Sequence, residues 1–182
     1  MVMPGASGAA AGGELEEILD LSSETDAKLE QCKTLVTAGQ LQEALTLLAA
    51  LEKRCRVGND HKSLARVCEA SLLACKEIGD EEALLQTLQT LSTRRSQKSS
   101  AIRSLVQTAT PWCIVEPYEP LPVNSESEKT SRDKLIVALR DITDGKLFLE
   151  RERAQFTRAL AIIKVRNISK QLNKAINQRL KY

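Results

Sequence analysis

Apolar residues recur at spacings of three and four along most of this chain, and this periodicity predicts a series of amphipathic helices. The clearest segment runs from Leu41 to about Arg56, where the apolar positions share one helical face. Its inward positions are predicted to be Leu41, Ala44, Leu45, Leu48, Leu51 and Cys55. Similar patterns predict further helices at about 27–38, 61–78, 99–108 and 146–163, between Asp80 and Arg94, and from Arg132 onward.

Three glycines lie between these predicted helices. The stretch Gly39–Leu45 recurs, one residue shorter, as Gly79–Leu84, and a period of about 40 residues is typical of helical solenoids. A glycine can adopt the left-handed conformation that ends one helix and lets the chain fold back into the next. Gly145 is expected to do the same. The pattern therefore predicts an all-α fold of antiparallel helical hairpins stacked in tandem, like tetratricopeptide repeats.

The chain divides into five predicted segments. Four of the five prolines lie in the third one together with Trp112, which predicts an exposed loop pinned by that ring. Helix N-caps are expected at Thr25 or Asp26, at Asp60 and at Asp80. The segments are a disordered or weakly helical tail (1–24), helical-repeat hairpins (25–109), a proline-rich loop or insertion (110–131), a third helical hairpin (132–163) and a basic amphipathic C-terminal helix (164–182).

The composition favours packed helices over a β-sandwich or barrel. Of the 182 residues, 42% are hydrophobic but only 3% are aromatic, and few runs resemble strands. This length suffices for one domain with a real core. No apolar run approaches the ~20 residues of a membrane-spanning helix. The start of the chain is rich in glycine and alanine and lacks a basic region, so we expect neither a signal peptide nor a transit peptide.

The cysteines indicate a reducing compartment. Their number is odd and no CxxC pair occurs, while Cys68 and Cys75 lie seven apart and would share one helical face. Buried, reduced thiols in a protein of the cytoplasm and nucleus are the best interpretation. The five are Cys32, Cys55, Cys68, Cys75 and Cys113.

The residues that could carry chemistry form no catalytic pattern. His61, the sole histidine, is expected to be solvated at a helix start, with no identifiable nucleophile beside it. Zinc ligand spacing between His61 and the cysteines is lacking. Acidic pairs such as Glu81-Glu82 and Glu16-Glu17 fit first turns or solvated faces better than acid–base catalysis, and no phosphate-binding glycine-rich loop occurs. We therefore expect no catalytic, cofactor-binding or metal-binding residues, and no enzyme.

Three charged regions each keep two interpretations. Arg94-Arg95 either neutralises a helix C-terminus or contacts a partner. The run 150–153 is either a solvated helix face with a weak ion pair or a contact surface. The six basic residues of 164–182 exceed the net charge of +2 of the whole chain, so the remainder is acidic. That last segment is expected to be docked or partly ordered, the alternative being binding to RNA, an acidic lipid surface or calmodulin. Its apolar residues recur every four positions at Ile168, Leu172, Ile176 and Leu180.

Three stretches resemble a known family. They are 41–56, Leu88–Gln97 and Thr143–Ala154. In this order they are similar to the N-terminal half of a non-ATPase lid subunit of the 26S proteasome, which belongs to the PCI-domain family. The resemblance covers roughly residues 25–164.

The resemblance implies a right-handed solenoid of helical hairpins, followed in the family by a winged-helix PCI module, and a non-catalytic scaffold without cofactors. The implied partners are other lid subunits, the ATPase base and the deubiquitinase subunit, and neither nucleic acid nor membrane. Because the sequence ends at Tyr182, we expect no complete PCI module and a truncated form of such a subunit, from a splice form or a gene-model artefact. Residues 110–131 look longer and richer in proline than the family's connection at that place.

Other functions stay open at this point. One is a subunit of a related PCI complex such as the signalosome, and another is a free helical-repeat adaptor between proteins. A third is a nucleic-acid or membrane binder that acts through residues 164–182.

Overall fold

The structure is a computed structural model, and it describes residues 19–115 and 117–179. Within these ranges the chain forms seven α-helices, two 3-10 turns and one two-stranded hairpin, which confirms the predicted all-α fold. The hand of the solenoid stays a prediction. The elements are α1 (Ser22–Thr37), α2 (Leu41–Val57), α3 (His61–Ile78), α4 (Glu81–Thr93), α5 (Ser99–Ala109), η1 (Thr110–Trp112), β1 (Ile114–Val115), β2 (Glu119–Pro120), α6 (Glu126–Thr143), η2 (Leu147–Leu149) and α7 (Glu150–Arg179).

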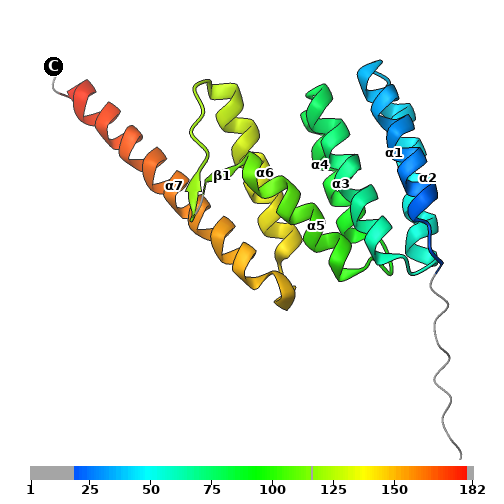
Figure 1. Ribbon diagram of the computed structural model, residues 1–182. Coiled ribbons are helices and arrows are strands. Elements are labelled where there is room, and N and C mark those ends of the chain that lie inside the picture. Colours follow the sequence, from blue (N-terminus) through cyan, green and yellow to red (C-terminus); the bar gives the residue numbers. More distant parts are fainter. Residues whose placement is uncertain (1–18, 116, 180–182) are drawn as a thin grey trace, which may run out of the picture.

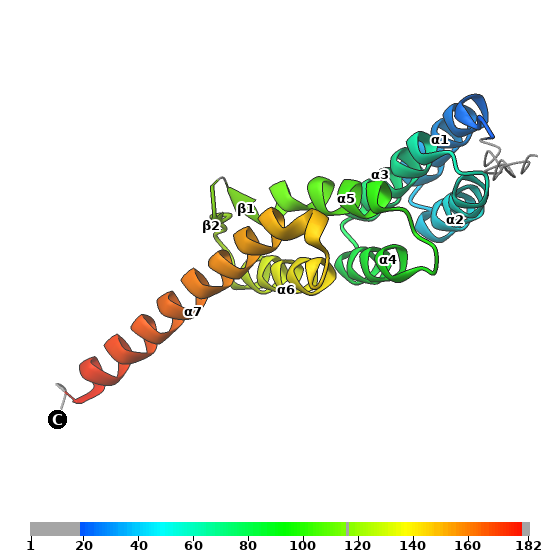
Figure 2. The same ribbon diagram turned by 90° about the horizontal axis from the view of Figure 1, so that it is seen from below.

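The helices stack in two layers along an elongated body (Figures 1 and 2). One layer holds α1, α3 and α5, and α3 packs against both of the others. The other layer holds α2, α4 and α6, of which α4 contacts α6. Successive helices from α1 to α5 also pack across the layers, and α6 packs against α7. The distal end of α7 extends well past the rest of the body (Figure 1).

The three predicted glycine turns have the expected backbone conformation. Gly39, Gly79 and Gly145 have φ of 76°, 80° and 68°, in the left-handed region. At the first turn, the amide of Gln40 donates to the carbonyl of Leu35, 2.9 Å away. This bond satisfies a carbonyl that the end of α1 would otherwise leave unpaired. The hairpins therefore reverse where the repeat predicts.

The predicted apolar faces meet in one continuous core. Leu48, Cys68, Leu88 and Leu105 are fully buried, and so is Phe156 on α7. Burying a leucine or phenylalanine side chain stabilises a fold by about 1.5–3 kcal/mol. These faces, and not a central sheet, hold the layers together. The buried apolar residues of the last pair of helices are Leu135, Ile136, Leu139, Ile142, Leu149, Phe156, Ala159 and Ile163.

Two of the predicted helix caps are correct and one is wrong. Asp60 accepts a hydrogen bond from the Ser63 amide at 3.0 Å, and Asp80 accepts one from the Ala83 amide at 2.9 Å. Neither Thr25 nor Asp26 caps α1, which begins at Ser22 without a side-chain cap. Thr25 is instead fully buried inside the helix. The helix starts earlier because the extra turn buries this side chain.

The proline-rich region is shorter and more ordered than predicted. It ends at Ser125, which caps α6 in a reciprocal capping box with Glu128, so α6 begins six residues before the predicted Arg132. The strands β1 and β2 pair antiparallel within it and were not predicted. Trp112 is half-buried, and Lys76 lies 5.6 Å from the centre of its ring, which supports the predicted pinning.

The predicted boundary at residue 164 is absent, because α7 runs without a break from Glu150 to Arg179. The predicted division into a hairpin helix and a separate tail follows a change in composition and not a change in backbone conformation. The first turn after Gly145 is the 3-10 turn η2, so α7 starts later than the predicted Lys146.

Candidate functional site

Among the described residues, the candidates for catalysis lie on different helices. His61 is exposed as the first residue of α3. Glu81 and Glu82 lie in the first turn of α4, where carboxylates favour the helix dipole. The pair at 16–17 falls outside the described residues. Among the described residues, no group of three or more histidine, cysteine or acidic side chains could hold a metal ion.

All five cysteines are free and buried, as the sequence predicts. Burial raises the pKa of each thiol, because the apolar surroundings disfavour the thiolate. For Cys68 and Cys113 the pKa reaches about 12. Since the thiolate is the reactive form, burial disfavours nucleophilic chemistry at these side chains, which pack in the core.

The main polar cluster of the interior is one that the sequence did not reveal. The carboxylate of Glu52 on α2 is buried, and the residue is only 1% exposed. It pairs with Arg56 at 3.1 Å and with Arg94, and it accepts a hydrogen bond from the Gln97 amide at 3.1 Å. Arg56 in turn donates to the carbonyl of Arg95 at 3.1 Å. We call Glu52, Arg56, Arg94 and Gln97 the Glu52 network.

The Glu52 network gives the Arg94-Arg95 pair a structural role. It ties the end of α2 to the loop between α4 and α5, across more than forty residues of sequence. A buried charge needs such partners, because an unpaired one is strongly destabilising. The other charged run is solvated: Arg153 pairs with Asp144 at 2.8 Å, and both side chains are exposed.

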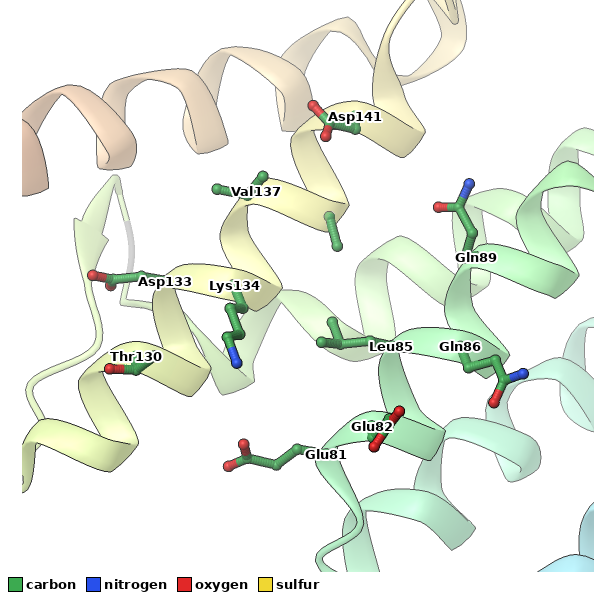
Figure 3. A pocket seen from close by; sticks show the side chains of 11 residues that line it. Glu81, Glu82, Leu85, Gln86, Gln89, Thr130, Asp133, Lys134, Val137 and Asp141 are labelled. Atoms are coloured by element: carbon green, nitrogen blue, oxygen red, sulfur yellow. The ribbon is translucent and has the colours of Figure 1, made fainter.

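An open groove of about 1170 Å³ lies between α4 and α6. In Figure 3, Leu85 points from α4 toward α6, and Glu81 and Lys134 lie near it. The groove is lined by four carboxylates and one lysine. Two of the carboxylates, Asp133 and Asp141, form ion pairs with the neighbouring arginines. The lining of the open groove therefore combines apolar side chains such as Leu85 and Val137 with charged ones. Its lining is Glu81, Glu82, Leu85, Gln86, Gln89, Thr130, Asp133, Lys134, Val137, Ala138 and Asp141.

The second candidate surface is the distal part of α7. Here the predicted amphipathic helix exists, but it is not docked: Ile168, Leu172 and Ile176 are 64%, 59% and 47% exposed. Val165 is 63% exposed. We call Val165, Ile168, Leu172 and Ile176 the α7 stripe. Exposed apolar side chains gathered on one helix are typical of an interaction surface.

The proline-rich hairpin holds α7 on both sides of the point where the stripe begins. Arg158 stacks on the ring of Tyr118 at 4.4 Å, and Gln155 donates to the carbonyl of Pro117 at 3.4 Å. Arg166 pairs with Glu119 at 2.7 Å. These contacts fix the direction in which the distal part of α7 leaves the body. No helix in the described part of the chain is long and apolar enough to cross a membrane.

Several known proteins are similar to this chain over most of its length. A protein of Dictyostelium discoideum named 26S proteasome non-ATPase regulatory subunit 12 is 32% identical over 145 residues, which are 80% of this chain and 30% of that protein. An Arabidopsis thaliana protein named homolog B of the same subunit is 28% identical, covering 69% of this chain and 26% of its own.

A third relative is the Schizosaccharomyces pombe protein named 26S proteasome regulatory subunit rpn501. It is 29% identical over 142 residues, which are 78% of this chain and 30% of that protein. This chain thus spans about a third or less of the length of the curated relatives it matches. The family described as PSMD12/CSN4, N-terminal, matches residues 43–178, which is most of the sequence, and the chain belongs to that family.

Proposed function

We propose that this chain is a non-catalytic scaffold subunit of the lid of the 26S proteasome regulatory particle. In that role it supports the ATP-dependent degradation of ubiquitinated proteins. The observation that carries this proposal is the match to the PSMD12/CSN4 N-terminal family over residues 43–178. The names of its relatives in three distant organisms favour the proteasome.

The physical properties of the body suit a scaffold. The two layers present long helical surfaces, and the Glu52 network links helices that are distant in sequence. The thiols and most leucines are inside the core. The open groove between α4 and α6 and the α7 stripe both face outward, and these are the surfaces proposed to contact other proteins.

The proposed partners are neighbouring lid subunits, the ATPase base and the deubiquitinase subunit, in the cytoplasm and nucleus. This chain corresponds to about 30% of the length of two of these relatives, so the proposal concerns the contacts that the N-terminal solenoid of such a subunit makes.

A second candidate is a subunit of a signalosome-like complex. The description of the matching family favours it, because that description names CSN4 beside PSMD12. A free adaptor built from helical repeats is the remaining alternative. The three differ in which proteins accompany the chain in the cell.

The test is purification of the chain from its own cells. A tag added to the chain at its own gene would be used to isolate it under native conditions, followed by mass spectrometry. We expect lid subunits at amounts comparable with the chain itself. A matched sample carrying Phe156→Ala, which weakens the core, should lose them, since binding requires the folded array.

Recovery of signalosome subunits in place of lid subunits would transfer the assignment to the second candidate. Recovery of the chain alone, with the parent protein folded by circular dichroism, would reject both complexes and leave the free adaptor.

A further inference from the structure

The apolar face of α7 changes sides within one unbroken helix. In its first half, Phe156, Ala159 and Ile163 are 0%, 0% and 9% exposed and pack in the core beside α6. Successive residues of an α-helix turn by roughly 100°. By this geometry the α7 stripe points about 170° away from those buried residues. The positions that continue the buried face are Asn167, Lys170 and Lys174, which are polar and exposed.

The change of face means that the α7 stripe has a different partner from the first half of the helix. If the stripe packed against α6, its side chains would lie on the same face of α7 as Ile163. Instead, the helix extends past the body (Figures 1 and 2), and none of the four stripe residues belongs to the hydrophobic core of the described chain. The stripe is therefore a surface of its own.

We propose that the α7 stripe is a docking seam for an amphipathic helix of a partner protein, with acidic residues flanking the partner's own apolar seam. The width of the stripe supports a helix as the occupant. Its four side chains span only about 80° around the axis, narrower than the face that a helix turns to a globular core and typical of a coiled-coil seam. β-branched residues with leucine are also the usual side chains of such seams.

The charge beside the stripe identifies the chemistry of the partner. From Lys164 to Arg179 the helix carries five basic residues and no acidic one. By the same helical geometry, Lys164 lies beside the stripe and Arg179 continues it past Ile176, whereas Arg166, Lys170 and Lys174 point to other sides of the helix. A partner helix with glutamates beside its seam would pair with Lys164 and Arg179, whereas a second copy of this chain would place like charges together.

The same residues disfavour the other occupants. A helix that lies in a membrane surface usually carries a wide apolar face with aromatic side chains, and residues 164–179 contain no aromatic residue. Nucleic acid would neutralise the basic residues but leave the stripe in water. A helical partner with acidic flanks fits the apolar stripe together with Lys164 and Arg179.

The test uses the full chain and a designed peptide as the probe. The peptide has about four heptads, with isoleucine and leucine along its seam and glutamate at the flanking positions. A control peptide has the same seam flanked by lysine. Fluorescence anisotropy is expected to give saturable binding of the glutamate peptide that weakens with added salt, and at least tenfold weaker binding of the lysine peptide.

Two variants localise the binding. Leu172→Asp is expected to weaken binding of the glutamate peptide at least tenfold, whereas Asn167→Asp, with the same charge change on the opposite face, should bind like the parent. Circular dichroism checks that both variants stay folded. Equal binding of both peptides, or no effect of Leu172→Asp, would overturn the proposal.

Two further results would assign the stripe to another occupant. Self-association in sedimentation that Leu172→Asp abolishes would replace the partner helix by a second copy. Binding to vesicles of phosphatidylserine and phosphatidylcholine, without binding to the peptide, would replace it by a membrane surface. Neither result depends on the proteasome assignment, which is tested separately by the proteins that accompany the chain.

Discussion

The first and second halves of α7 form one helix, but they differ in what happens to their apolar side chains. Phe156 is fully buried beside α6, while Leu172 is 59% exposed. Both follow the same spacing of three and four, so helical periodicity alone does not distinguish them. An apolar stripe shows that a helix has a face to bury, and only the arrangement of the neighbouring elements decides whether that face is buried within the chain.

Charged residues differ between the same two regions. In the body, Glu52 is 1% exposed and pairs with two arginines. Near the distal part of α7, Glu119 and Arg166 pair at 2.7 Å, but both side chains are more than half exposed. Water solvates the second pair and screens its attraction, so only the first makes the fold depend on it.

The largest expected effect comes from shortening the two apolar side chains of α7. Phe156→Ala should lower the free energy of unfolding by about 3–5 kcal/mol, because it leaves a cavity in the core. Leu172→Ala should change that free energy by less than about 0.5 kcal/mol, since the side chain is already in water. Urea unfolding followed by circular dichroism measures both. Similar losses for the two variants would mean that the stripe is packed within the chain.

The second effect compares the two carboxylates. Glu52→Ala should cost about 2–3 kcal/mol, because it removes a partner from Arg56, Arg94 and Gln97 at once. Glu119→Ala should cost less than about 1 kcal/mol. Lys53→Ala, an exposed neighbour on α2, is the control for an ordinary surface change on that helix. If the loss for Glu52→Ala equalled that for Glu119→Ala, the Glu52 network would not stabilise the body.

The sequence was sufficient for features that are local. Gly39, Gly79 and Gly145 reverse the chain as the repeat predicts, because the need for positive φ depends on the residue itself. The caps at Asp60 and Asp80 are local too, because each side chain accepts a hydrogen bond from an amide only three residues further on. The start of α1 was missed since Thr25 is a good cap in isolation, but burial against α2 makes an earlier helix start more favourable.

The Glu52 network was missed because its partners lie far away in the sequence. A signal did exist: Glu52 stands four residues after Leu48 and three before Cys55, in the phase of the buried face. A charge in that phase predicts a buried ion pair without saying with which residue. The continuity of α7 was also visible in principle, as no glycine or proline occurs between 150 and 179.

A smaller effect is expected from exchanging glycine and alanine in the two regions. At Gly79 an added Cβ would meet no atom within 4 Å, so Gly79→Ala costs only the strain of φ +80°, about 1–2 kcal/mol of global stability. Ala175→Gly lowers the local helix preference by about 1 kcal/mol. Because that turn makes no core contact, hydrogen exchange of nearby amides should accelerate while global unfolding stays unchanged. A global loss from Ala175→Gly would contradict the separate behaviour of the distal part.

The smallest effect concerns the pH dependence of the body at Asp60. Burial raises the pKa of this carboxyl, but hydrogen bonds from Ser63 and Leu21 outweigh it, so the folded-state pKa lies below its ordinary value of 3.8. The carboxylate therefore stabilises the folded state above that value, and the contribution is lost as the pH falls through the lower, folded-state pKa.

Asp60→Asn should consequently reduce the free energy of unfolding by about 1 kcal/mol at pH 6, and the difference from the parent should shrink toward pH 2. Unfolding curves in urea at several pH values measure it. Lys174→Ala, in the distal part of α7, is the control and should give a difference that does not change with pH. A gap between Asp60→Asn and the parent that stays constant into acid would mean that the cap acts through its shape alone, without a contribution from its charge.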